Sequence, residues 1–421
     1  MGTPDVSTGS APLATALYML FMSALILDTG GALGLKYSAF LLVTLYLGIA
    51  AVTGRATVPL RVLVIEGLLF GVAPVFFLYL AVTAYGVAPS TAVGRLAPFI
   101  TWLLYPVLLK VDSRERLVSV FSRAILFGAV LILVMFGVLI GLYALDRVDT
   151  IVAINTFTDS HRLGYFGVKP LDTGTTFFFP GVYFRWSLLL IPAAIIAFAR
   201  GGVRFFTTVA AILASASAAA LVALVLGVGC VLFDHRLSRS LRRRYAHRAF
   251  VLAIGLGVLG VALYRAGFGG AVELIVGKLS SASTSVKIGH IQSIIDESTQ
   301  SIGRLLFGMG VGSTFYSAGA GDFVSDVEVS HFELVRQFGL VYALAFFTYV
   351  GWLTAAVWRT DGNGRLLGIG LMLLFIAAGT NPLLLTSVFF ILLVVCRAYL
   401  TIAAKPESGL QLPLSAPARY H

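Results

Sequence analysis

The chain has 421 residues, of which 58% are hydrophobic and 12% are charged. About a quarter of the residues of a soluble protein are charged, because water must solvate its surface. The composition therefore excludes a soluble domain and predicts an all-α polytopic integral membrane protein, with a single membrane domain over 1–421. Its 30 Lys and Arg against 19 Asp and Glu fit basic cytoplasmic loops, and nucleic acid is not an expected partner.

Apolar stretches long enough to cross a bilayer as a helix, about 20 residues, recur along the chain. Ten single spans are predicted, at 12–28, 37–53, 62–83, 89–109, 117–144, 177–199, 249–265, 340–358, 366–383 and 385–402. The stretch 205–233 is too long for one crossing, and basic residues flank both of its ends. Because Lys and Arg gather on the cytoplasmic side, it is predicted to cross twice, as two helices that meet near Ser215–Ser217.

Together these spans give about twelve predicted transmembrane helices, with both termini in the cytoplasm and a cytoplasmic tail over 403–421. This topology leaves a first periplasmic loop, 145–176, and a large one, 266–339, that contains short helices. Loops of this length are usually functional. Basic residues are unexpected on this side, yet the two loops carry Arg147, Arg162, Lys169, Lys278, Lys287, Arg304 and Arg336. An anionic substrate on the outer face would account for them.

The large loop contains a pattern typical of an amphipathic helix on a membrane surface. Isoleucines recur at helical spacing on one face, and Lys287 and His290 lie on the other. Three glycines follow, Gly308, Gly310 and Gly312. Because glycine allows a positive φ and close approach of the backbone, their amides could contact a phosphate or a glycan, although a plain turn also explains them.

Two residues near the end of this loop are predicted to be catalytic. Glu328 and His331 are three apart, which places them on one face of a helix. A neutral histidine oriented by a carboxylate can take a proton from an attacking hydroxyl. The alternative is a histidine that only forms a hydrogen bond at a helix packing surface.

Charged residues within the apolar spans are further candidates. Arg185 lies a few residues inside the predicted span 177–199, where an unpaired arginine costs several kcal/mol unless it reaches the headgroups. Arg95 and Arg123 are similar. Glu66 either pairs with one of these arginines or acts in a proton relay.

The order of these features resembles the bacterial O-antigen polymerase and O-antigen ligase superfamily (Wzy and WaaL types). Its motifs lie between about 160 and 390, within a topology that covers most of the chain. Four segments carry the resemblance: GVYFRWSLLLIP, ILASASAAALVALV, KIGHIQSIIDESTQSIGRLLFGMGVGSTF with EVSHFELVRQFGL, and TNPLLLTSVFF. Lys287 stands where the ligases commonly have arginine, and no asparagine follows His331, which favours a polymerase.

The resemblance implies an inverting glycosyltransferase of the bacterial inner membrane that needs no metal and no cofactor. His331 would activate the acceptor with Glu328, and Arg185, Lys287, Arg304 and Arg336 would bind pyrophosphate. The donor would be a polyprenyl-pyrophosphate-linked oligosaccharide in the membrane lipid, as in O-antigen or exopolysaccharide synthesis. The acceptor would be a second glycan, or lipid A core for a ligase, and a flippase or chain-length regulator is a possible partner. A transporter of an anionic solute is the alternative of another class, but no internal repeat is found.

Overall fold

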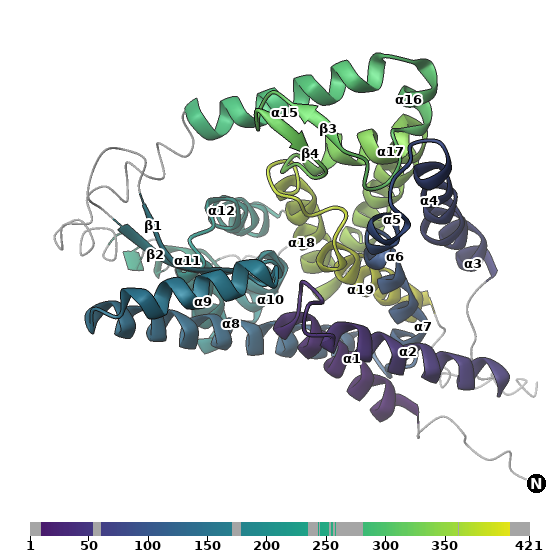
Figure 1. Ribbon diagram of the computed structural model, residues 1–421. Helices are drawn as coiled ribbons and strands as arrows, with labels where there is room; N and C mark the ends of the chain where they lie inside the picture. Colours follow the sequence, from purple (N-terminus) through teal and green to yellow (C-terminus); the bar gives the residue numbers. More distant parts are fainter. Residues whose placement is uncertain are drawn as a thin grey trace, which may run out of the picture.

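The computed structural model describes residues 10–53, 60–170, 178–234, 243, 245–251, 254–255, 257, 281–360 and 362–404. These residues are mainly helical, and their strands form two small antiparallel sheets, which agrees with the predicted all-α class (Figure 1). Five helical segments are long and apolar enough to cross a membrane: 35–52, 64–83, 89–108, 114–144 and 330–358. The other apolar helices are shorter, so the twelve crossings stay a prediction. Most of the predicted span 249–265 and of the tail lies outside the described residues.

The N-terminal part follows the predicted spans closely. Its helices are α1 (Ser10–Leu27), α2 (Leu35–Val52), α3 (Leu60–Gly67), the π-helix η1 (Leu68–Val72) and α4 (Ala73–Thr83). The predicted span 89–109 is broken into α5 (Pro89–Gly94), α6 (Ala97–Ile100), η2 (Thr101–Leu103) and α7 (Leu104–Leu108). Pro98 and Pro106 lie in this stretch and cannot donate helical hydrogen bonds. The long helix α8 (Arg114–Ala144) starts where the Ser113 hydroxyl accepts from the amide of Arg116.

The predicted span 177–199 is wrong in its first part. Residues of the first loop form α9 (Val148–Ser160) and β1 (Gly164–Pro170), and β1 pairs with β2 (Phe178–Phe184) in an antiparallel ladder. Phe178, Phe179, Tyr183 and Phe184 therefore belong to a β-strand and not to a helix, which agrees with the preference of aromatic residues for strands. The helix begins only at η3 (Ser187–Leu189) and α10 (Leu190–Arg200). Arg185 consequently lies in the turn after a strand and not inside a span.

The helix α10 forms the centre of the molecule. Every residue from Leu190 to Phe198 is buried, as expected of a helix that is apolar on all sides. It packs against α18 (Asn363–Ala377) and against α11 (Val203–Ala214), which is followed by α12 (Ala218–Leu232). The break between α11 and α12 falls at Ser215–Ser217, as predicted, with Ala216 at a positive φ of 51°. The predicted break into two helices is confirmed, and the two membrane crossings of 205–233 stay a prediction, because both helices are shorter than the five spanning candidates.

The described part of the large loop forms a cover over one end of the helices (Figure 1, top). It contains α15 (Ser281–Thr299), α16 (Ile302–Phe307), β3 (Phe315–Ser317) and β4 (Asp322–Val324). The predicted helix is present as α15, but the predicted division of its faces is wrong: His290, expected on the polar face, is buried, whereas Ile288 and Ile295 are exposed. Ile294, one turn after His290, packs on Met309, Phe315, Val327 and Val329. The buried face of α15 therefore contacts the loop's own small core.

The last helices are α17 (Ser330–Trp358), α18 and α19 (Ser387–Ala404). α17 bends sharply at Gly339, whose φ is 77°. Its first part folds back on its second, so that the ring centroids of His331 and Phe347 lie 5.6 Å apart. The membrane-crossing part of α17 therefore corresponds to the predicted span 340–358.

Replacing Gly339 by alanine is expected to destabilise the protein by at least about 1–2 kcal/mol, because a side chain disfavours a positive φ. A Cβ there would also come within 2.2 Å of the carbonyl oxygen of Leu306. The matched control is Gly137→Ala in α8, where a Cβ would meet nothing within 4 Å. The midpoint of thermal unfolding in detergent measures the loss of stability of each variant. Equal midpoints for the two variants would contradict the bend.

Candidate functional site

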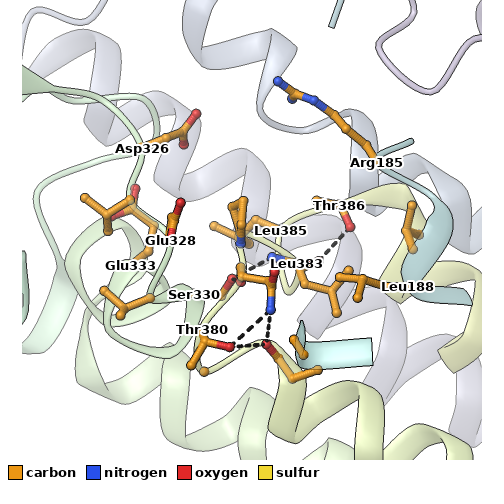
Figure 2. A pocket seen from close by; sticks show the side chains of 18 of the residues that line it. Arg185, Leu188, Asp326, Glu328, Ser330, Glu333, Thr380, Leu383, Leu385 and Thr386 are labelled. Atoms are coloured by element: carbon orange, nitrogen blue, oxygen red, sulfur yellow. Dashed lines mark hydrogen bonds between the residues drawn. The ribbon is translucent and has the colours of Figure 1, made fainter. Parts of the chain in front are cut away.

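A cavity of about 1770 Å³ lies where segments from both halves of the chain converge. All four segments that carry the family resemblance contribute to its lining. The lining residues include Tyr183 and Arg185, 215–217, Lys287 and Ile288, 328–330, 380–383 and 385–387. Ser330 joins two of these segments, because its hydroxyl accepts from the amide of Leu383 at 2.6 Å. Residues that are far apart in sequence are thus brought into one site (Figure 2).

The charged residues of the cavity make it suitable for an anion. Five cationic side chains line it, Lys36, Arg95, Arg162, Arg185 and Lys287, against three carboxylates, Asp326, Glu328 and Glu333. The two kinds of group are unevenly distributed. Figure 2 shows Arg185 on one side of the cavity and the three carboxylates on the other.

The cationic end of the cavity consists of Lys36, Arg162 and Arg185. The sheet brings the two arginines together, because Gly164 pairs with Phe184 and the amide of Arg185 donates to the carbonyl of Leu163 at 3.1 Å. Both arginines are exposed, and neither has a carboxylate within 4 Å among the described residues. These two guanidinium groups are therefore available to a phosphate.

Local packing fixes this end of the cavity. Trp186, next to Arg185, is fully buried, and a Cβ on Gly128 of α8 would lie 2.3 Å from its ring. Lys36 is held by the α1–α2 turn, where its ammonium donates to the carbonyl of Thr29 at 3.0 Å. Asp28 closes the same turn by accepting from the amide of Leu33 at 3.1 Å.

The carboxylate end consists of Asp326, Glu328 and Glu333, at and before the start of α17. Arg95 forms an ion pair with Asp326. The ammonium of Lys287 lies 3.6 Å from a carboxylate oxygen of Glu328, whose side chain is 60% exposed. Glu333 is 5% exposed and is paired with Arg336 at 2.6 Å. Glu328 is thus the most accessible of the three carboxylates.

Arg336, predicted to bind pyrophosphate, is fully buried. Its guanidinium donates to both oxygens of Glu333, at 2.6 and 2.8 Å, and to the carbonyl oxygens of Ser313 and Ser325 at 3.0 and 3.1 Å. It also stacks over Phe315 at 4.5 Å. Arg336 is not among the residues that line the cavity, and it anchors the loop that carries Asp326 and Glu328.

Arg304 and the three glycines also lie outside the cavity lining. Arg304 pairs with Glu297 of α15 at 2.6 Å. Gly308, Gly310 and Gly312 all have a positive φ, between 75° and 85°. A Cβ on Gly308 or Gly310 would lie within 3 Å of the backbone of Gly339 or Ala81. The structure thus places the first two glycines at close packing contacts, and a contact of the three with phosphate stays a prediction.

His331 does not line the cavity with Glu328. The prediction that these residues share a helical face is wrong, because α17 begins at Ser330 and Glu328 precedes it. The imidazole lies instead beside Phe375 and Phe347, with ring centroids 4.6 and 5.6 Å away. The catalytic role of His331 stays a prediction, and the cavity offers Glu328 in its place.

The other charged residues of the spans have different surroundings. Glu66 forms a buried ion pair with Arg397 of α19. A pairing of Glu66 with an arginine was expected, but its partner is none of Arg95, Arg123 and Arg185. Arg123 is exposed on α8 and does not line the cavity. Arg95 does line it.

Two residues that the sequence analysis did not assign connect the parts of the site. Burial raises the pKa of Tyr183 to about 12. The charge of Arg185 lowers this pKa and the charge of Glu328 raises it, so the phenol lies close enough to both the cationic and the carboxylate end of the cavity to be affected by each. The Nδ1 atom of His290 lies 2.5 Å from the hydroxyl of Ser317, which fastens α15 and its Lys287 to β3. Burial lowers the pKa of His290, while Glu328 and Glu333 raise it.

No protein-family model and no curated protein matches this chain. Within the described residues, no group of three His, Cys, Asp or Glu side chains is placed to hold a metal ion.

Replacing Arg336 by alanine is expected to destabilise the protein by about 3–5 kcal/mol, because it leaves the carboxylate of Glu333 buried without a partner. The matched control is Arg304→Ala, which removes a partly exposed pair with Glu297 and should cost less than about 1 kcal/mol. Denaturant or thermal unfolding in detergent measures the loss of stability of each variant. A small loss for Arg336→Ala would show that this pair does not anchor the loop.

Proposed function

We propose that the protein is a glycosyltransferase that polymerises polyprenyl-pyrophosphate-linked oligosaccharide repeat units on the periplasmic face of the bacterial inner membrane. One observation carries the proposal: a large cavity in a helical membrane protein has a cationic end opposite an accessible carboxylate. The motifs that resemble O-antigen polymerases and ligases contribute to the lining of this same cavity.

In this proposal the cationic end binds the pyrophosphate of the donor. Arginines can hold phosphate oxygens with two parallel hydrogen bonds, and fixed cations stabilise negative charge as it develops on a leaving group. Arg162 and Arg185 suit this task because they have no carboxylate partner among the described residues. Lys36 adds a third positive charge beside them.

The acceptor would bind at the carboxylate end. The oxygen of an acceptor hydroxyl attacks the anomeric carbon, the bond from that carbon to the phosphate oxygen breaks, and pyrophosphate leaves with the electron pair. The hydroxyl proton passes to Glu328, and direct displacement inverts the anomeric carbon. Glu328 suits this role better than Glu333, whose carboxylate already accepts several hydrogen bonds from Arg336 and Gln337.

The lining also offers room for the lipid part of a donor. Exposed apolar side chains of three helices border the cavity: Val222 and Leu226 of α12, Ile288 of α15 and Ile376 of α18. Such a surface suits a polyprenyl chain that leaves the charged site for the bilayer. This combination of an anion site with an apolar border supports a lipid-linked donor.

Purified protein supplied only with lipid-linked repeat units is expected to produce longer glycans, which gel electrophoresis detects. Glu328→Gln should lower the rate by about 10²–10⁴-fold, because it removes the base. Arg185→Ala should lower it by about 10²–10³-fold, because charge on the leaving group loses its partner.

The matched controls are Asp296→Asn and Arg123→Ala, which change exposed groups outside the cavity and should leave the rate unchanged. A strict need for lipid A core would indicate a ligase. Solute flux in proteoliposomes without any glycan donor, together with no chain extension, would support the anion transporter. Full activity of Glu328→Gln would show that Glu328 is not the catalytic base.

A further inference from the structure

The short helix α16 packs against the bend of α17. A Cβ on Gly339, the residue at the bend, would lie 2.2 Å from the carbonyl oxygen of Leu306 and 2.5 Å from the amide nitrogen of Phe307. The membrane-crossing part of α17 begins directly after this bend. The end of α16 therefore lies where the second part of α17 enters the membrane (Figure 1).

The residues that follow α16 pack against the end of a second crossing segment, 64–83, which contains α4. The hydroxyl of Tyr85 donates to the carbonyl of Gly308 at 2.8 Å. A Cβ on Gly310 would lie 2.8 Å from the Cα of Ala81. α16 is thus held at the level where two apolar helices leave the hydrocarbon of the membrane.

Two large apolar side chains of α16 are exposed. Ile302 is 77% exposed and Phe307 is 46% exposed. The one charged residue of this helix is Arg304, whose guanidinium pairs with Glu297 of α15. Exposed apolar area costs about 25 cal/mol per Å² in water, so the two side chains favour an apolar environment.

The two crossing helices beside α16 also expose apolar side chains. Val341 and Leu344 are exposed on α17 directly after the bend, and Phe76 and Tyr79 are exposed on α4. Such side chains contact lipid, because they belong to segments that are long and apolar enough to cross the membrane. Since α16 packs at the end of both segments, its own exposed side chains extend this lipid-facing surface toward the headgroups.

The length of α16 fits the boundary layer of a bilayer. Its six residues rise about 9 Å. A bilayer about 40–45 Å thick has a hydrocarbon core of about 30 Å, which leaves a headgroup layer of about 5–7 Å on each side. Because Phe307, the last residue of α16, lies at the edge of the core, the helix stays in or close to this layer at any tilt.

We propose that α16 anchors the large loop in the membrane surface, with Phe307 and Ile302 inserted among the headgroups and upper acyl chains of the adjacent leaflet. The partner is the lipid surface and not a second protein, because lipid already surrounds the two helix ends that hold α16. α16 follows α15, which carries Lys287, and the Arg304–Glu297 pair joins the two helices. The membrane surface thereby sets the height of α15 over the charged cavity. This inference does not rest on the proposed glycosyltransferase function.

A nitroxide spin label on α16 tests the anchor in phospholipid vesicles without any glycan donor. The full chain needs a single reactive cysteine, so Cys230 is replaced by alanine, whereas Cys396 is fully buried and stays. Phe307→Cys then carries the label. Collisions with oxygen, which concentrates in hydrocarbon, are compared with collisions with a water-soluble nickel chelate.

Two further labelled variants calibrate the measurement. Val341→Cys marks the lipid-facing surface of α17 just after the bend. The matched control is Phe323→Cys, an exposed aromatic position of the same loop that packs on Tyr316 in the β3–β4 hairpin. The oxygen-to-nickel collision ratio at Phe307 is expected to be about threefold or more above that at Phe323, and close to that at Val341, because the label lies in an apolar environment.

Two results would overturn the anchor. A ratio at Phe307 equal to that at Phe323 would show that α16 faces water. Few collisions with either reagent would show that another protein surface covers α16. If Phe307→Cys does not fold, a label at Ile302→Cys gives the same test, because Ile302 is the more exposed of the two side chains.

Discussion

The buried pair of Arg336 and Glu333 is the interaction on which the site depends. A guanidinium removed from water needs every donor satisfied, and here it reaches Glu333, Ser313 and Ser325. These contacts tie the start of α17 to the loop before it. The position of Glu328 in the cavity follows from this anchor.

The cationic end and the carboxylate end of the cavity are built from different parts of the chain. A two-stranded sheet and the α1–α2 turn supply Arg162, Arg185 and Lys36, whereas the loop before α17 supplies the carboxylates. Charges interact more strongly next to apolar helices than in water, so unpaired arginines attract an anion strongly there. Paired groups such as Arg95 and Asp326 shape the site without adding net charge.

The bend at Gly339 gives the first part of α17 two different environments. It turns this part of the helix back, so that successive residues face different surroundings. Ser330 lines the charged cavity, whereas the imidazole of His331 lies beside Phe347 and Phe375.

The sequence by itself determined the helical membrane class, the positions of the five helical segments that are long enough to cross a membrane, and the break at Ser215–Ser217, because apolar run length and small residues are local properties. It also indicated the segments that meet in the cavity. Only the tertiary structure decided which side chains face it. Spacing predicted Glu328 and His331 on one helical face, but the helix starts after Glu328. Arg336 and Arg185 look alike in sequence. Arg336 is buried against a carboxylate, whereas Arg185 has no carboxylate partner among the residues that the structure describes, because burial and pairing depend on contacts between distant segments.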